Sequence, residues 1–153
     1  MTKILFVCHG NICRSPMAEF LFKDMVKKRS VQDEFLIESA ATSYEEIGNP
    51  VHPGTKRKLA EHGISAKGKQ ARKLLKSDYD NYDLFIGMDS ANIRNMLRIF
   101  GSDPQNKVKK MLEYAGSDRD VADPWYTGNF DVTYDDITDG LKGLYAHITG
   151  DEY

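Results

Sequence analysis

Short, continuous apolar runs recur along the chain, and segments with helical periodicity separate them. The runs occupy Lys3–Cys8, Phe35–Ile37, Leu84–Ile86 and, more weakly, Val108–Leu112. Unbroken apolar runs are typical of strands that are buried on both faces, whereas a half-buried strand alternates apolar and polar residues. We therefore expect an α/β fold in three layers, with an open four-stranded parallel sheet and helices on both of its faces.

Helical periodicity marks three segments of the chain. One follows Pro16, one runs from a predicted N-cap at Ser90 to a stop at Gly101, and one lies near the C-terminus. We expect the apolar stripe of this last segment to face the core, and its members are Tyr134, Ile137, Leu141, Leu144, Tyr145 and Ile148.

Length and composition exclude several classes of protein. A length of 153 residues predicts one domain, residues 1–153, and the small net charge of −2 does not favour a nucleic-acid partner. Two cysteines are too few to staple a secreted scaffold. Because there is also no signal-peptide pattern and no apolar stretch near the ~18 residues that span a bilayer, we expect a cytoplasmic monomer without a membrane partner.

The first apolar run ends at a loop that reads Cys-His-Gly-Asn-Ile-Cys-Arg-Ser-Pro, residues 8–16. Ser15 is a favourable N-cap and Pro16 a favourable first helical residue, so we expect a helix to begin there. Gly10 and Asn11 readily adopt unusual backbone angles, which lets the loop curl. A curled loop at a helix N-terminus directs its N–H groups inward, and the pattern therefore predicts a phosphate-binding loop.

Cys8 lies at the base of this predicted cradle and is the candidate nucleophile. A helix N-terminus and the neighbouring Arg14 both favour the thiolate, and the planar guanidinium can bind two oxygens of a phosphate. The Ser15 hydroxyl can donate a hydrogen bond to the sulfur and stabilise it as a leaving group. A thiolate that faces a bound phosphorus atom can attack it in line. The alternative is an inert, buried cysteine beside an incidental arginine.

These residues resemble the signature of the low-molecular-weight protein tyrosine phosphatases, Cys-x5-Arg-Ser between the first strand and the first helix. The extended match includes Gly10, Asn11, Cys13 and Pro16, and the resemblance covers essentially the whole chain. It implies a single phosphatase domain over residues 1–153. It also implies hydrolysis of phosphotyrosine in proteins or peptides through a phosphocysteine intermediate, with release of inorganic phosphate and without a metal or other cofactor.

The resemblance also implies a general acid. The family places an aspartate in an Asp-Pro loop before the last helix, and Asp123-Pro124 matches it. Asp123 would protonate the leaving oxygen and then act as base for the water that hydrolyses the phosphocysteine. The alternative for any single aspartate in this acid-rich region is a solvated surface carboxylate.

The implied substrate contacts come from the loop and from two rims. Trp125 and Tyr126 would form an aromatic wall beside the phosphotyrosine ring, unless they belong to the core. Tyr44 lies in the segment that the family uses for the opposite rim, where members often carry Trp at the position of Glu45. The expected substrate-binding residues are His9, Gly10, Asn11, Ile12, Cys13, Tyr44, Trp125 and Tyr126.

Further residues match supporting positions of the family. Ser39 matches the residue that holds the unusual backbone of Asn11, and Lys69 stands where the family has a histidine in the same network. Asp89 and Asn92 match an Asp-x-x-Asn element near the active site, although locally they are typical of helix caps. Cys8 and Cys13 match two cysteines that form a reversible disulfide in the family. The alternative for Cys13 is the role of a small buried residue.

Three alternative functions share the fold or the cradle. Arsenate reductases of this architecture use two further cysteines as a disulfide relay, and this chain has only Cys8 and Cys13. Protein arginine phosphatases typically carry Thr where Ile12 stands, so Ile12 and the aromatic wall favour phosphotyrosine. A non-catalytic phosphopeptide-binding module would not need both Cys8 and Asp123.

Overall fold

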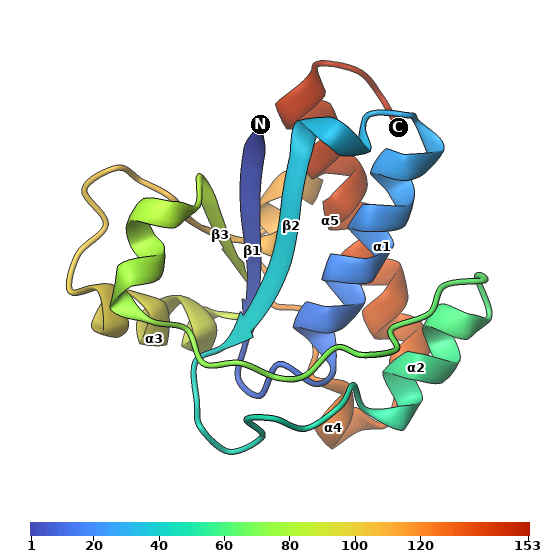
Figure 1. Ribbon diagram of the computed structural model, residues 1–153, viewed down its shortest axis with the longest axis horizontal. Coiled ribbons are helices and arrows are strands. Elements are labelled where there is room, and N and C mark those ends of the chain that lie inside the picture. The colour runs from blue at the N-terminus through green and yellow to red at the C-terminus, as the bar shows by residue number, and fades with distance from the viewer.

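A computed structural model describes all residues from Met1 to Tyr153, and its centre is one open sheet of four parallel strands (Figure 1). The strand order is β2-β1-β3-β4, and every pair is parallel. The predicted four-stranded parallel sheet is therefore confirmed. The strands are β1 (Thr2–Cys8), β2 (Phe35–Ala41), β3 (Leu84–Gly87) and β4 (Val108–Lys110).

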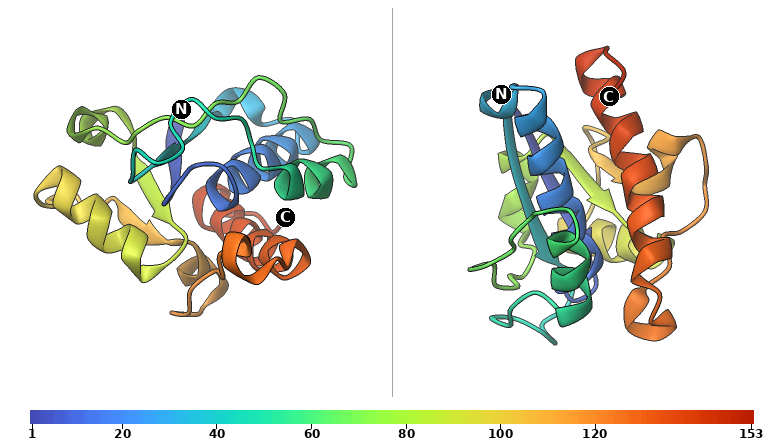
Figure 2. Two further views of the ribbon diagram at one scale, coloured as in Figure 1. Left: turned by 90° about the horizontal axis from the view of Figure 1, so that it is seen from below. Right: turned by 90° about the vertical axis from the view of Figure 1, so that its right-hand side faces the viewer.

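Helices cover both faces of the sheet, as the unbroken apolar runs predicted. Figure 2 shows α3 on one side of the strands and α1, α2 and α5 on the other. In β1, Ile4 and Phe6 face the larger core with α1 and α5, whereas Leu5 and Val7 face the smaller core with α3. The helices are α1 (Arg14–Lys28), α2 (Pro53–Ala60), α3 (Ser90–Phe100), α4 (Pro124–Thr127) and α5 (Phe130–Thr149), with 3-10 turns η1 (Gln32–Glu34), η2 (Lys76–Asn81) and η3 (Met111–Ala115).

Two predicted helix caps are wrong. Helix α1 begins at Arg14 with Cys13 as its N-cap, and no side chain caps it, so Ser15 is a residue of the first turn. Helix α3 is capped by Asp89, which exchanges hydrogen bonds with Asn92 in a reciprocal capping box, and Ser90 is its first residue. Helix α1 therefore begins two residues earlier, and α3 one residue earlier, than the favourable hydroxyl residue indicated.

The C-terminal helix confirms its predicted apolar stripe. Ile137, Leu141, Leu144 and Tyr145 of α5 are buried, and the other two members of the stripe pack against the same core. No helix combines the length and the apolar character that crossing a bilayer requires. The strand β1 lies between β2 and β3, so the strand order reverses beside it. In open α/β sheets, ligands bind at the carboxyl ends of the strands at such a point.

Candidate active site

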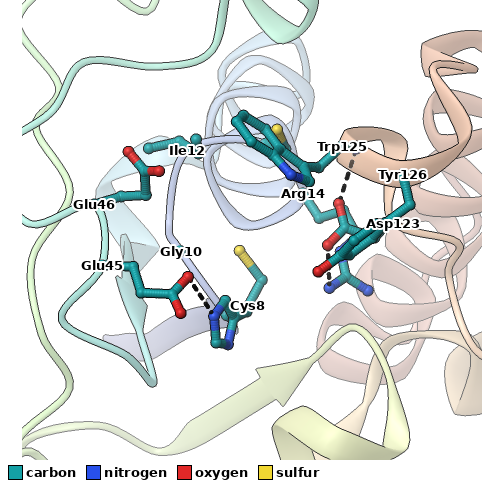
Figure 3. Close-up of a pocket in the computed structure, with 11 residues that line it drawn as sticks. Cys8, Gly10, Ile12, Arg14, Glu45, Glu46, Asp123, Trp125 and Tyr126 are labelled. Carbon is teal, nitrogen blue, oxygen red and sulfur yellow. Dashed lines mark hydrogen bonds and ion pairs between the residues drawn. The ribbon is translucent and has the colours of Figure 1, made fainter.

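The candidate active site lies where the carboxyl end of β1 meets the N-terminus of α1. Cys8 is the last residue of β1 and Arg14 the first of α1, and Asp123 precedes α4. Figure 3 shows these three side chains converging on one pocket from different elements. The parallel sheet explains this convergence, because the loops that follow its strands all gather at one edge.

The loop between β1 and α1 curls through a single left-handed residue. Asn11 has φ +59°, and its backbone N–H points at Cys8 Sγ, 3.3 Å away. Gly10 does not have a positive φ, so the predicted role of glycine in the curl is wrong. Its small size matters instead, because a Cβ on Gly10 would lie 3.3 Å from Cγ of Glu46. The chain therefore curls at Asn11 and is closely packed at Gly10.

A hydrogen-bond chain leads from Cys8 into the protein interior. The Cys8 sulfur lies 3.0 Å from Ser15 Oγ, and the Asn11 side-chain amide donates both to Ser15 Oγ at 2.7 Å and to Ser39 Oγ at 2.9 Å. The backbone N–H of Arg72 donates to Asn11 Oδ1, which fixes the orientation of that amide. Ser39 therefore contacts Asn11 directly, as the predicted support of Asn11 requires.

The inner end of this chain is the carboxylate of Glu19, a residue that the sequence alone did not single out. Glu19 is 3% exposed, and its carboxylate accepts the Ser39 hydroxyl proton at 2.5 Å. Because that proton is committed, Ser39 Oγ accepts from Asn11, and Ser15 Oγ also accepts from Asn11. The Ser15 proton is then free to point at the Cys8 sulfur. The available signal in the sequence was a glutamate on the buried face of the first predicted helix.

Lys69 closes the inner end of the same chain. Its ammonium group lies 3.3 Å from Glu19 Oε1 and donates to the Ser39 carbonyl at 3.0 Å. Lys23 also pairs with Glu19, at 2.6 Å. Burial lowers the pKa of Lys69, and the charge of Glu19 opposes that shift. The lysine thus occupies the network in which the family resemblance placed a histidine.

Arg14 is held rigidly beside the sulfur. It is 2% exposed, and Nη1 donates at 2.8 Å both to Asp89 and to the Val121 carbonyl. Burial disfavours the cation, but Cys8, Asp89 and Asp123 together outweigh burial and raise the pKa of Arg14. Asp89 therefore has two functions, because its other oxygen caps α3. A permanent, fixed cation at this position can bind phosphate oxygens.

Asp123 stands at the mouth of the pocket. One carboxylate oxygen accepts the Trp125 N–H at 3.0 Å, and the other lies 3.4 Å from Arg14 Nη2. Trp125 is 57% exposed and Tyr126 84% exposed, so neither aromatic belongs to the core. The rings of Trp125 and His52 form a T-shaped pair, with centroids 5.7 Å apart. Both aromatic side chains are therefore available to a substrate ring.

The pocket wall agrees with most, but not all, of the expected substrate-binding residues. Asn11 is buried behind the loop and does not line the pocket. Tyr44 does not line it either, and its exposed ring lies 4.7 Å from Lys73 Nζ instead. Glu45 and Glu46, which were not expected to bind substrate, line the pocket on that side. The lining residues are Cys8, His9, Gly10, Ile12, Cys13, Arg14, Glu45, Glu46, Asp123, Trp125 and Tyr126.

Both cysteines of the site are free and buried. Burial, reinforced by the neighbouring Cys8, raises the pKa of Cys13 to about 12, so its thiol stays protonated at neutral pH. The two cysteines thus have different environments, since only Cys8 contacts Ser15 and the Asn11 N–H. No group of three or more His, Cys, Asp or Glu side chains lies close enough together to hold a metal ion.

Known proteins resemble this chain over nearly its full length. Residues 3–152 match the family described as "Low molecular weight phosphotyrosine protein phosphatase". The low molecular weight protein-tyrosine-phosphatase YfkJ of Bacillus subtilis is 41% identical over 150 residues, which are 97% of this chain and 96% of that protein. The low molecular weight phosphotyrosine protein phosphatase of Schizosaccharomyces pombe is 43% identical over 135 residues, 84% of this chain and 86% of that protein.

Solved structures resemble it equally well. The crystal structure of YfkJ from Bacillus subtilis matches with a TM-score of 0.94 at 41% identity, over 98% of this chain and 96% of that chain. The crystal structure of a Drosophila arginine phosphatase matches with a TM-score of 0.88 at 28% identity, over 99% of this chain and all of that one. Sequence and structure together show that the chain belongs to the low molecular weight phosphotyrosine protein phosphatase family.

Proposed function

We propose that this chain is a protein-tyrosine phosphatase that hydrolyses phosphotyrosine in proteins or peptides. The observation that carries the proposal is the placement of the Cys8 sulfur at the floor of a pocket that also contains Arg14 and Asp123. The exposed aromatic rings of Trp125 and Tyr126 at the mouth support a planar aromatic substrate. Relatives named protein-tyrosine-phosphatases support the same assignment.

The reaction has two steps. The Cys8 thiolate attacks phosphorus and forms the S–P bond, while the bond from phosphorus to the tyrosine oxygen breaks and Asp123 donates its proton to that oxygen. Water then attacks the phosphocysteine, Asp123 takes a proton from the water, and the S–P bond breaks to release inorganic phosphate. Arg14 and the loop N–H groups stabilise the charge on the phosphoryl oxygens in both steps. Ser15 donates to the sulfur as it leaves.

Arginine phosphatase activity is the second candidate, because one of the similar structures is described as an arginine phosphatase. Ile12 lines the pocket of this chain and presents only apolar atoms there. An apolar side chain favours an aromatic ring over a phosphoguanidinium group, whose N–H groups would need hydrogen-bond acceptors. We also propose that the enzyme works in the cytoplasm, because unpaired reactive thiols persist in a reducing compartment.

Turnover of three phosphopeptides tests the proposal. Peptides with one sequence and a central phosphotyrosine, phosphoserine or phosphoarginine are compared by phosphate release. We expect phosphotyrosine to be hydrolysed with a far higher kcat/KM than the other two. We also expect Cys8→Ser to abolish turnover, because a serine alkoxide is not accessible near neutral pH. Preferential hydrolysis of phosphoarginine would replace the first candidate by the second.

A further inference from the structure

The pocket has one acidic side, opposite the aromatic wall. Glu45 and Glu46 line this side, and Figure 3 shows both side chains across the pocket from Asp123. The only basic side chains among the lining residues are His9 and Arg14. Arg14 is almost fully buried and pairs with Asp89 and Asp123, not with Glu45 or Glu46. The outer part of the pocket is therefore negatively charged, although the bottom is built to hold an anion.

Several contacts hold the two glutamates against the phosphate-binding loop. The His9 carbonyl accepts hydrogen bonds from Ser43 N at 3.1 Å and from Ser43 Oγ at 3.0 Å. The His9 ring nitrogen Nε2 lies 2.9 Å from Glu45 Oε2. The side-chain stem of Glu46 packs over Gly10, where a Cβ would come within 3.3 Å of it. The carboxylates thus have a defined place beside the cradle.

Their charge is not cancelled by their partners. His9 compensates Glu45 only when its imidazole is protonated. Glu46 accepts a hydrogen bond from the Asn49 amide at 2.6 Å, and that partner is neutral. The negative charge of Glu46, at least, is therefore not compensated by its partner.

We propose that Glu45 and Glu46 determine peptide specificity, favouring phosphotyrosine flanked by Lys or Arg over phosphotyrosine flanked by acidic residues. The proposal rests on the proposed phosphotyrosine phosphatase function. With the phosphate in the cradle and the ring beside Trp125, the peptide main chain leaves at the mouth, and the flanking side chains come near the two carboxylates. A cationic flank is attracted there, and an acidic flank is repelled.

Three phosphotyrosine peptides that differ only in the flanking residues measure this preference. The residues on both sides of phosphotyrosine are Lys, Gln or Glu, and kcat/KM is measured at low and at high ionic strength. We expect the order Lys above Gln above Glu, with roughly a tenfold difference between the extremes at low salt. High salt should reduce the difference, because exposed charges are screened.

Charge variants assign the preference to these residues. The double variant Glu45→Gln with Glu46→Gln should bring the Lys-to-Glu ratio close to one, and Glu45→Lys with Glu46→Lys should invert it. A role of the glutamates in loop structure alone would lower kcat/KM for all three peptides without inverting their order. The matched control, Glu34→Gln with Glu152→Gln, makes the same change in net charge at two exposed positions outside the pocket and should keep the wild-type ratio.

The outcomes separate this proposal from the function on which it rests. Hydrolysis of all three peptides at equal rates, or an order that the glutamine and lysine variants leave unchanged, would overturn the specificity proposal and leave the phosphatase function standing. No hydrolysis of any phosphotyrosine peptide, together with hydrolysis of a phosphoarginine peptide, would overturn both.

Discussion

Glu19 supports the nucleophile from a distance, because its carboxylate fixes the Ser39 hydroxyl, and Ser39 in turn helps to hold the Asn11 amide that donates to Ser15 beside Cys8. A carboxylate can only accept, so Ser39 donates to Glu19, and the NH2 group of Asn11 can only donate, to Ser39 on one side and to Ser15 on the other. The Ser15 proton therefore remains for the sulfur. A hydrogen bond that ends on a thiolate stabilises the charged form. Ion pairs with Lys69, which is mostly buried, and with the exposed Lys23 hold the Glu19 carboxylate in place.

The Glu19→Gln variant tests this support of Cys8. We expect kcat/KM for a phosphotyrosine substrate to fall about tenfold, which corresponds to about 1.4 kcal/mol for a weakened charge-assisted hydrogen bond. Glu34→Gln, the same chemical change on the exposed turn η1, is the control and should keep the wild-type kcat/KM. A folded Glu19→Gln variant with wild-type kcat/KM would contradict a role of Glu19 in the site.

Asp123 is predicted to act through proton transfer, and the leaving group reveals that role. Asp123→Ala should slow the cleavage of phosphotyrosine by about 10²- to 10⁴-fold, the range typical of a lost general acid. An aryl phosphate whose phenol is strongly acidic needs little protonation, so its cleavage should slow much less. Rates of phosphoenzyme formation for a series of aryl phosphates provide the measurement. Equal losses across the series would contradict the assignment of Asp123 as the acid.

The residues of the site that could be predicted are those with a local signature. Cys8, Arg14 and Ser15 lie within eight residues, and Asp123 is marked by the following proline. Glu19 and Glu46 could not be assigned this way. Their functions depend on contacts with residues 20 or more positions away, at Ser39 and at Gly10, which only the folded sheet brings together.

The elements that were predictable are those with a long apolar pattern. Helix α2 (Pro53–Ala60) has no such pattern, because only Gly54, Thr55 and Leu59 of it are buried. The fourth apolar run was predicted to extend to Leu112, but β4 ends at Lys110 because Met111 and Leu112 turn into η3 to fill the core under α5. Apolar character marked burial correctly there but did not distinguish a strand from a turn.

The contact between α5 and η3 depends on a glycine. A Cβ at Gly143 would lie 1.8 Å from the carbonyl oxygen of Tyr114, so the two backbones can approach this closely only without a side chain. We expect Gly143→Ala to lower the free energy of unfolding by at least about 2 kcal/mol through overpacking, despite the higher helix propensity of alanine. Urea denaturation measures the loss. Lys142→Ala, at the exposed neighbouring position, is the control and should change stability little.

For the whole molecule, two tyrosine hydroxyls with raised pKa values predict a loss of stability at high pH. Burial, assisted by nearby carboxylates, raises the pKa of Tyr82 and of Tyr114 from 10.0 to about 12. Between these values the native state keeps protons that the unfolded state has lost. Each tyrosine therefore contributes stability that is fully present below about pH 10 and is lost as the pH rises through about 12, with a slope of at most about 1.4 kcal/mol per pH unit.

Urea unfolding between pH 8 and pH 11 measures this loss. We expect Tyr82→Phe and Tyr114→Phe each to flatten the decline above pH 10, because each removes one linked proton. Tyr44→Phe, which changes a ring that is 75% exposed, is the control. A decline in the two variants as steep as in the wild-type protein would contradict the linkage.

The parallel sheet with helices on both faces was predictable, because strand and helix patterns alternate along the chain. Connections between parallel strands also have a single preferred hand. The open edge of that sheet then accounts for the position of the site. The distribution of charge in the pocket was not predictable. Its acidic side, Glu45 and Glu46, comes from the segment after β2, whereas its cation, Arg14, comes from α1.

The proposed reaction depends on the transfer of phosphate to Cys8, and trapping the intermediate detects that transfer. The Asp123→Ala variant is mixed with an aryl phosphate that has a strongly acidic phenol, quenched rapidly, digested and analysed by mass spectrometry. We predict one phosphoryl group on the peptide that carries Cys8, and none on that peptide when Cys8 is replaced by alanine. Phosphate on another residue, or turnover close to wild type in Cys8→Ala, would contradict phosphoryl transfer to Cys8.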